Sequence, residues 1–326
     1  MSDKTNLDEI NKIPSPTWSW LKMNADSMTV DENPSVLEMN VRSSGSGFSI
    51  AQNGASIEVS GKPDKPLLIL FDCSKKTGSL ASSQTIRARK DSEAVVIFLY
   101  EGDSSQNVSV IRTNVHAEEN SKIHIIKAQL LGKNQNQIDE TSCLAEKDSL
   151  VRFTQIELGG NHVCSALHAM LDGHKARFQS ETAFIAKGSQ HLDMNHVVIH
   201  KADKTDTKMS VKGVVDGNAV KTYRGTIDFR RGCAGATGDE QEETLLMSGS
   251  AVNKSIPVIL CDEEDVSGSH GATLGRLGTD ELFYMQSRGV SEDEAKKMMT
   301  RAKVLSASAL IPDLSVRKKI EDFIGA

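Results

Sequence analysis

A turn-and-strand phrase recurs along the middle of the chain and limits its fold more than any other feature. Ala117-Glu-Glu-Asn-Ser-Lys-Ile123 leads into an alternating strand pattern, and Ala145-Glu-Lys-Asp-Ser-Leu150 repeats the phrase 28 positions later. Looser copies begin at Leu171 and Asp216, and no helical pattern separates them. Short strands that recur every ~22–28 residues predict the stacked coils of a parallel β-helix, with a closed sandwich or barrel as the rival.

The composition agrees with a strand-built core. Hydrophobic residues make up 38% of the chain and aromatic residues only 4%, which suits a core of small and β-branched side chains. The longest apolar runs, Pro66–Phe71 and Ala94–Tyr100, are strand-sized and fall short of the roughly 20 residues of a membrane span. The net charge of −6 gives no reason to expect nucleic-acid binding. Since Met1–Asn6 has no apolar signal core, we expect a cytoplasmic protein without membrane or nucleic-acid partners.

A β-helix has two ends, and each end exposes the unpaired backbone of a terminal rung. Such edges must be covered by other structure or paired with another chain. The pattern therefore predicts a lid at one end, and a partner or a second lid at the other.

The N-terminal segment is predicted to be a short helical arm. Asn6–Ile13 places Leu7 and Ile10 on one side of a helix, which Pro14 would end. Trp18 and Trp20 follow, and we expect these two rings to pin the arm to the body, with a docking segment as the alternative. The predicted division is a helical arm over 1–30, a β-helix core over 31–275 and a helical subdomain over 276–326.

Three helices are expected at the C-terminus. Thr279 is a predicted N-cap, Ser291–Glu294 has the pattern of a capping box, and Pro312-Asp313 opens the third helix. The third helix carries the apolar stripe Val316, Ile320, Phe323 and Ile324. A segment this short cannot enclose its own stripe, so the stripe is expected to pack on the strands or on another protein.

Known catalytic and metal-binding motifs are missing from the sequence. It has no P-loop, no H-E-x-x-H and no G-x-S-x-G. The five cysteines (Cys73, Cys143, Cys164, Cys233 and Cys261) have no metal-site spacing, and free thiols are expected. His191, His196 and His200 lie in a strand pattern, which would place the last two about 13 Å apart, too far for one ion. A carbohydrate-active β-helix enzyme stays open as an alternative, although it would need a cluster of acids on one rung.

A lone histidine stands where the strand pattern gives way to helices. Ser269-His270-Gly271-Ala272-Thr273 surrounds a single imidazole with small residues, just before the first C-terminal helix. This placement marks His270 as a functional-site candidate, with a purely structural histidine as the alternative.

Four phrases together resemble one family. They are Ile13-Pro-Ser-Pro-Thr-Trp18, Tyr223-Arg224-Gly225, Ser269–Thr273, and Leu282-Phe283-Tyr284-x-x-Ser287-Arg288-Gly289. In this order they resemble the SufB/SufD family of iron–sulfur cluster assembly scaffolds, and its SufD-like branch in particular.

The resemblance implies a fold and a set of partners. The fold is a right-handed parallel β-helix with a short N-terminal helical segment and a C-terminal helical subdomain. The role is a non-catalytic scaffold that pairs with a SufB-like paralogue and binds a SufC-like ATPase; a homodimer without a separate SufB is the alternative. The implied paralogue interface includes Ser269, His270, Gly271 and Thr273, and the implied SufC-docking residues are Leu282, Phe283, Tyr284 and Arg288.

Two departures from the SufB pattern favour the SufD-like branch. SufB-like chains carry a cysteine near the position of Glu242, and read His-Glu-Ala where this chain reads His270-Gly271-Ala272. His270 is then the remaining candidate ligand for iron or a cluster, because a neutral imidazole binds iron through one nitrogen. The resemblance implies that the chain alone binds no cofactor stably, and that an iron–sulfur cluster is held transiently and shared with the partner.

Overall fold

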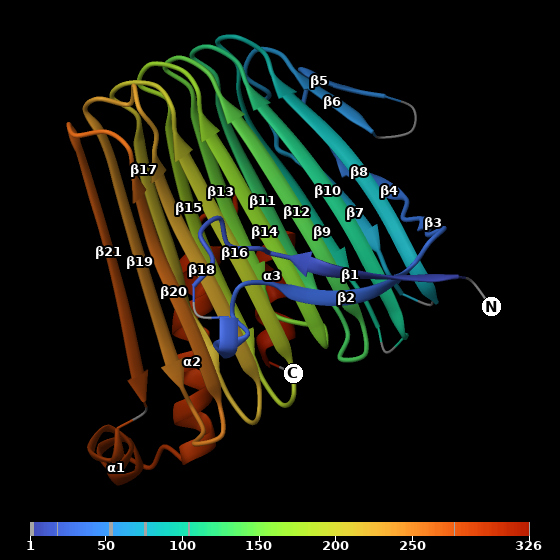
Figure 1. Ribbon diagram of the computed structural model, residues 1–326. Coiled ribbons are helices and arrows are strands. Elements are labelled where there is room, and N and C mark those ends of the chain that lie inside the picture. The colour runs from blue at the N-terminus through green and yellow to red at the C-terminus, as the bar shows by residue number, and fades with distance from the viewer. Residues whose placement is uncertain are drawn as a thin grey trace.

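The computed structural model describes residues 3–17, 19–51, 55–74, 77–103, 105–276 and 278–325. The chain forms a parallel β-solenoid of about 8 turns, with three short helices at the C-terminus (Figure 1). Two sheets form its walls, and each turn of the chain adds one strand to each sheet. This confirms the predicted β-helix.

The ten-stranded wall is called sheet I and the nine-stranded wall sheet II. Sheet I contains, from the C-terminal end, β20 (Val252–Cys261), β18 (Val220–Phe229), β16 (His191–His200), β14 (His162–Leu171), β12 (Asn136–Ala145), β10 (Asn107–Ala117), β8 (Gly78–Ala88), β6 (Ser56–Val59) and β5 (Phe48–Ile50), with β3 (Ser35–Val36) beside β8. Sheet II contains β21 (Val266–Arg276), β19 (Ala236–Leu246), β17 (Asp206–Val215), β15 (Arg177–Ala186), β13 (Leu150–Glu157), β11 (Lys122–Leu130), β9 (Glu93–Glu101), β7 (Leu67–Asp72) and β4 (Met39–Ser43).

The repeated phrase of the sequence corresponds to the rung of the solenoid. Ala117, Ala145 and Leu171 are successive register partners in sheet I. Rungs vary in length: partners are 26 residues apart at Asn136 and His162, and 32 apart at Phe229 and Cys261. The upper part of this range exceeds the expected 22–28 residues, because longer turns join the C-terminal strands.

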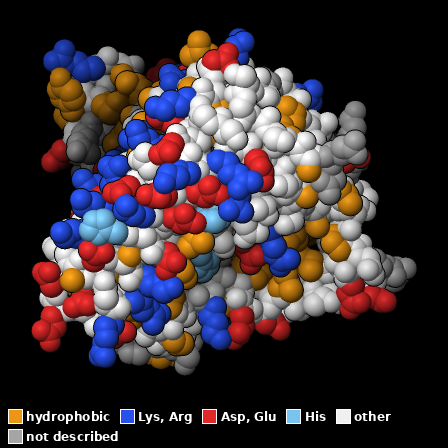
Figure 2. All heavy atoms as spheres, turned by 90° about the horizontal axis from the view of Figure 1, so that it is seen from above, with side chains coloured by type: hydrophobic (Ala, Val, Ile, Leu, Met, Phe, Trp, Pro, Cys, Tyr) orange, Lys and Arg blue, Asp and Glu red, His pale blue; other side chains and the backbone are white. Residues whose placement is uncertain are grey.

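The turns that lead from sheet I to sheet II stack on one another and carry charges of both signs. Figure 2, which looks onto this end, shows basic and acidic side chains interspersed across it. Glu119 pairs with Lys90 at 2.8 Å on one neighbouring turn and with Lys147 at 3.4 Å on the other. Exposed pairs of this kind stabilise each rung by ~1 kcal/mol at most.

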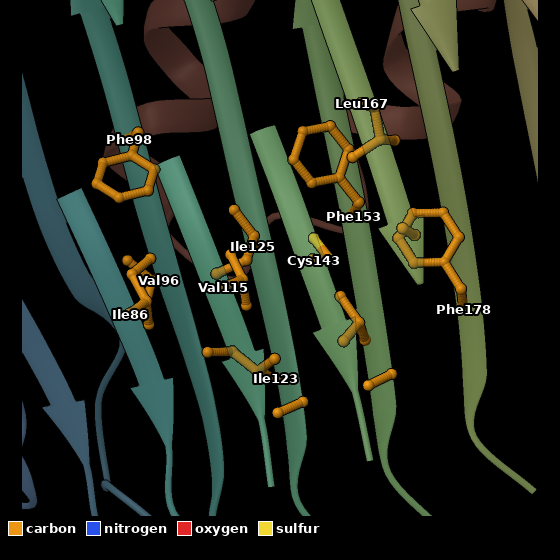
Figure 3. Close-up of a cluster of buried hydrophobic side chains, with 14 of the residues drawn as sticks. Ile86, Val96, Phe98, Val115, Ile123, Ile125, Cys143, Phe153, Leu167 and Phe178 are labelled. Atoms are coloured by element: carbon orange, nitrogen blue, oxygen red, sulfur yellow. The ribbon is translucent and has the colours of Figure 1, made fainter. Parts of the chain in front are cut away.

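Apolar side chains from both walls fill much of the lumen, in one cluster that runs from Leu37 to Ala236. Figure 3 shows Phe98, Phe153 and Phe178 of sheet II among Val115 and Leu167 of sheet I. All five are buried, and the surrounding core is mostly isoleucine, valine, leucine and alanine. This agrees with the expected core of small and β-branched side chains.

Gly132 lies where the backbones of two adjacent rungs approach each other, and it gives a stability prediction. A Cβ at this position would lie 1.4 Å from the carbonyl oxygen of Asp103, a backbone atom that cannot move aside freely. Gly132→Ala should lower the free energy of unfolding by about 2–3 kcal/mol, measured by urea denaturation. The matched control is Gly249→Ala, where a Cβ meets no atom within 4 Å. Equal stability of the two variants would contradict the close approach.

The N-terminal arm is a two-stranded ribbon, so the predicted helix over 6–13 is wrong. β1 (Lys4–Ile10) pairs antiparallel with β2 (Asp26–Asp31), and the ribbon lies across the outer face of sheet I (Figure 1). The helical residues described in the arm are η1 (Ser19–Leu21). A register shift between Leu7 and Ile10 explains the error, because a bulge lets side chains three apart face the same way, as they would on a helix.

Buried polar contacts and a small apolar cluster hold the arm to sheet I. Arg224 of β18 donates from Nε to the carbonyl oxygen of Met23 at 2.6 Å, and Asn11 donates from Nδ2 to Asp193 Oδ1 at 2.7 Å. The apolar cluster comprises Ile10, Met28, Ile138 and Cys164. Trp20 is 75% exposed, so this ring does not pin the arm as predicted, and Trp18 lies outside the described residues.

Helices α1 (Thr279–Ser287), α2 (Glu292–Ser308) and α3 (Leu314–Gly325) follow β21. The capping box of Ser291 and Glu294 is confirmed, and Asp313 Oδ1 accepts the amide of Val316 at 3.1 Å. Buried residues of α2 and α3 pack on the outer face of sheet II, as the apolar stripe predicted; they include Val304, Ala307, Val316 and Ile320. Among the described residues, no helix is long and apolar enough to cross a membrane.

Candidate functional site

The C-terminal end of the solenoid presents an open rung, formed by β20 and β21. Each is the last strand of its sheet, and among the described residues no further strand pairs with either outer edge. Every residue of β21 is exposed or half-buried. At the opposite end, β5 and β4 run antiparallel to their neighbours and interrupt the parallel stacking. The sequence predicted a lid at one end and a partner or a second lid at the other. The described residues show an interrupted stack at β4 and β5 and uncovered edges at β20 and β21.

His270 lies in the middle of β21, directly beside Glu240 of β19 in register. Glu240 and Glu242 are buried while Gln241 is exposed, so the even-numbered positions of β19 face the lumen. His270 shares that parity and stands exposed at the mouth of the lumen, whereas Ser269, Gly271 and Thr273 belong to the outer face. Ser269 Oγ donates to Asp239 Oδ1 at 2.6 Å on that outer face. The four predicted interface residues thus share one strand and divide between its two faces.

Buried charges form the floor of this mouth. The ammonium of Lys221 in β18 pairs with the carboxylate of Glu242, and both side chains are almost fully buried. Glu242 also accepts hydrogen bonds from Ser255 Oγ of the open rung and from Thr244 Oγ1 at 3.1 Å. Burial lowers the pKa of Lys221, and Glu242 opposes that effect. The position at which the resemblance implies a SufB cysteine is therefore occupied by a carboxylate with its own buried counter-ion.

Glu240 is a second buried acid in this floor. Burial, together with the nearby carboxylate of Glu242, raises the pKa of Glu240 to about 7. A Cβ on Gly225 would lie 1.7 Å from Glu240 Oε1, so the glycine leaves room for the carboxylate. The inward-facing acids of β19 replace the apolar alternation that usually marks a strand in a sequence.

Neighbouring residues of the Tyr-Arg-Gly element point to opposite faces of sheet I. Tyr223 points into the lumen and meets His196 edge to face, with ring centroids 5.3 Å apart. Arg224 points outward, where Nη1 contacts Asp193 Oδ1 at 2.5 Å and Nε contacts the arm. Alternation along β18 explains this division.

Polar groups continue from the mouth into the lumen. Lys127 Nζ contacts Asp139 Oδ1 at 2.5 Å across the two walls, and Gln155 donates to Glu157 Oε1 at 2.6 Å. These side chains are buried. Charged and amide side chains therefore share the lumen with the apolar core, on rungs that also carry Ile125 and Phe153.

Four of the five cysteines are buried, while Cys261 is exposed and its thiol is free. Cys261 ends β20, and its Sγ lies 3.1 Å from the carbonyl oxygen of Glu263. An exposed thiol therefore accompanies His270 on the open rung. Sequence reasoning missed it, because the cysteines were judged by their spacing along the chain.

Helix α1 carries the exposed aromatic residues of the C-terminal region. Phe283 is 72% exposed and Tyr284 60% exposed, while Leu282 is half-buried. The guanidinium of Arg288 lies 5.4 Å from the centroid of the Tyr284 ring, within cation–π distance. The predicted docking residues therefore form an exposed aromatic and basic surface on α1.

A second cluster lies under the arm, and sequence reasoning did not bring it together. Ligand atoms of Asp26, His162 and His191 all lie within 4.8 Å of one another. His162 and His191 are direct register partners in β14 and β16. His162 and His191 are one rung apart in the sequence, and this spacing could have indicated that they are neighbours in the sheet. His196 and His200 lie in β16, as predicted, and neither belongs to this cluster.

Comparison with known proteins gives one family. The family model described as "SUF system FeS cluster assembly, SufBD core domain" matches residues 71–303. The chain is 27% identical over 156 residues to the iron-sulfur cluster assembly protein SufB of Bacillus subtilis, covering 48% of this chain and 34% of that protein. It is 24% identical over 145 residues to SufD of the same organism, covering 44% and 33%. A SufBD family protein of Mycobacterium bovis is 23% identical over 214 residues, covering 66% and 25%. The matches span about a third or less of the length of these relatives.

Proposed function

Because the chain belongs to the SufBD family of iron–sulfur cluster assembly proteins, we propose that it is a scaffold subunit that pairs through its open rung with a SufB-like paralogue and docks a SufC-like ATPase through α1. The uncovered strand β21, with His270 at the lumen mouth, is the observation that carries this proposal. The family membership supports a scaffold over the carbohydrate-active enzyme that the strand pattern alone left open.

The outer edges of β20 and β21, unpaired among the described residues, support pairing through the open rung. A partner solenoid placed end to end would extend sheet I beyond β20 and sheet II beyond β21, satisfying backbone groups in both chains. Such addition of strands is favoured where a flat edge carries no covering element.

A SufD-like role is supported by the chemistry of position 242. A carboxylate paired with Lys221 cannot carry sulfur as a thiolate can, so this chain would leave the sulfur acceptor to its partner. The exposed imidazole of His270 would then contribute one ligand to a cluster completed across the interface. Such a cluster is the cargo of the scaffold, assembled at the interface and then passed on.

The ligand role of His270 gives a direct test. In a complex co-expressed with a SufB-like paralogue and a SufC-like ATPase, His270→Ala should leave the assembly intact but lower its iron and sulfide content several-fold, because one ligand is lost. Iron and acid-labile sulfide are measured per purified complex. Ser267→Ala, at an exposed residue on the opposite face of β21, is the matched control. Unchanged iron and sulfide in His270→Ala would reject the ligand role.

The docking role of α1 gives a second test. Phe283→Asp and Tyr284→Asp place a charge on an exposed aromatic surface, so the fold should persist while affinity for the SufC-like ATPase falls by about 30-fold or more, as at an aromatic hot spot. Calorimetric titration measures the affinity. The control is Leu314→Asp on α3, at a side chain that is 74% exposed. If both α1 variants bound the SufC-like ATPase with wild-type affinity, its binding site would lie outside α1.

The mass of the assembly distinguishes pairing with a SufB-like paralogue from the alternative of a homodimer. Native mass spectrometry of the purified chain, alone and then mixed with the SufB-like paralogue, should show a new assembly that contains both chains. A homodimer that persists in excess paralogue would favour the alternative.

A further inference from the structure

The cluster under the N-terminal arm has the geometry of a metal site. Asp26 Oδ2 lies 2.7 Å from His162 Nε2 and 3.4 Å from His191 Nε2. The two imidazole rings are stacked, with centroids 4.5 Å apart and planes inclined by 20°. Both Nε2 atoms therefore approach the same carboxylate oxygen from adjacent strands.

A fourth donor lies beside these three. Cys164 follows His162 by two residues and so occupies the same face of β14. Its Sγ lies 3.4 Å from Asp26 Oδ2 and 3.6 Å from His162 Nε2, and the residue is fully buried. Carboxylate, imidazole and thiolate donors together are typical ligands of Zn²⁺.

Four separations between these donor atoms can be compared with those around a tetrahedral ion. Zn²⁺ bonds of about 2.0–2.3 Å at tetrahedral angles place neighbouring ligand atoms about 3.3–3.7 Å apart. Of the four separations given above, three lie at 3.4 to 3.6 Å. The fourth, 2.7 Å between Asp26 and His162, is a hydrogen bond that the ion would replace.

The surroundings orient the carboxylate and leave a route for an ion. The amide of Ser27 donates to Asp26 Oδ1 at 2.7 Å, which turns Oδ2 toward the histidines, as outer partners of metal ligands do. The side chain of His191 is 40% exposed and those of His162 and Asp26 are 22% and 13% exposed. The site is thus half-enclosed beneath the arm.

Hydrogen bonding alone explains only part of this arrangement. It accounts for the contact between Asp26 and His162, but His191 then lies 3.4 Å from the same oxygen and stacked on His162. One cation between the donors would satisfy both imidazoles and the carboxylate at once.

We propose that Asp26, His162 and His191, with Cys164 as the fourth ligand, bind a divalent transition-metal cation of the zinc class. Asp26 begins β2 of the arm, whereas His162 and His191 begin β14 and β16 of sheet I. The ion would fasten the arm to the solenoid wall. This site involves none of the residues of the open rung, so it is independent of the cluster chemistry proposed there.

Cobalt is the probe for the test, because Co²⁺ replaces Zn²⁺ and is visible by absorption. The full chain, purified and treated with a chelator, is titrated with Co²⁺. Binding of a single equivalent with the intense visible bands of a tetrahedral ion is expected, together with a thiolate-to-cobalt band in the near ultraviolet. The double variant His162→Ala/His191→Ala should lose at least about 100-fold in affinity, since even outer partners of ligands are worth 10- to 100-fold.

Matched variants keep the test decisive. His174→Ala removes a half-buried histidine that pairs with Asp203 at 2.8 Å, and it should bind Co²⁺ as the wild type does. Cys164→Ser should lose the thiolate band but keep the visible bands; persistence of the thiolate band would overturn the fourth ligand. Zn²⁺ should also slow hydrogen exchange in β1 and β2 of the wild type alone. Failure of the wild type to bind Co²⁺, or equal binding by a double variant with native circular dichroism, would overturn the site.

Discussion

Lys221→Met is expected to lower the free energy of unfolding by about 3–5 kcal/mol, because it leaves Glu242 as a buried carboxylate without its counter-ion. Both side chains of this pair are less than 5% exposed. Lys221 also lies 5.4 Å from the Phe184 ring centroid and 5.2 Å from that of Tyr223, contacts that methionine replaces without charge. Urea denaturation measures the loss.

Replacing Glu242 by a neutral residue should restore most of the stability that Lys221→Met loses. In Lys221→Met/Glu242→Gln the amide keeps an acceptor for Ser255 and Thr244 while the buried charge disappears, so the double variant should be more stable than Lys221→Met alone. Lys212→Met is the matched control: Lys212 pairs with Glu181 at 3.5 Å with side chains 37% and 26% exposed, and its loss should cost at most ~1 kcal/mol. Similar losses from Lys212→Met and Lys221→Met would contradict the buried ion pair.

Glu157→Gln should change the pH dependence of stability. Burial and the nearby Asp139 raise the pKa of Glu157 from 4.5 to about 8, against the hydrogen bond from Gln155 and the charge of Lys127. The folded state therefore keeps a proton that the unfolded state releases. Below pH 4.5 the buried acid does not lower the free energy of unfolding of the wild type. As the pH rises toward 8, that free energy falls by on the order of 4 kcal/mol. Removing the acid removes this loss.

The measurement compares wild type and variant at several pH values. Glu157→Gln should match the wild type near pH 4.5 and become progressively more stable than it up to pH 8, as judged by urea denaturation. Glu119→Gln is the control of opposite sign, because hydrogen bonds from Lys90 and Lys147 lower the pKa of that exposed carboxyl. A constant difference between Glu157→Gln and wild type across this range would mean that Glu157 is ionised in the fold.

Local periodicity predicted the strands well where one face of a strand is apolar. Pro66–Phe71 and Ala94–Tyr100 fall within β7 and β9 almost completely, and the phrase at Ala117 and Ala145 marks successive rungs. Periodicity gives no apolar strand signal where the inward residues are charged, as at Glu240 and Glu242 in β19. It failed at Leu7 and Ile10, where a bulge imitates helical spacing.

One candidate site could be predicted from local sequence pattern and the other could not. His270 could be singled out because small residues and a change of pattern isolate it in the sequence. Asp26, His162 and His191 could not, because residues 136 positions apart meet only after the arm has folded back across sheet I.

Spacing along the chain was sufficient to predict the solenoid, its C-terminal helices and the histidine on the last rung, because each depends on a pattern within one rung or one helix. The folded chain was needed to show which polar residues enter the lumen, which edges stay unpaired and which side chains meet beneath the arm. Those outcomes depend on register between rungs and on contacts between distant segments. A period of two or 3.6 residues carries no information about either.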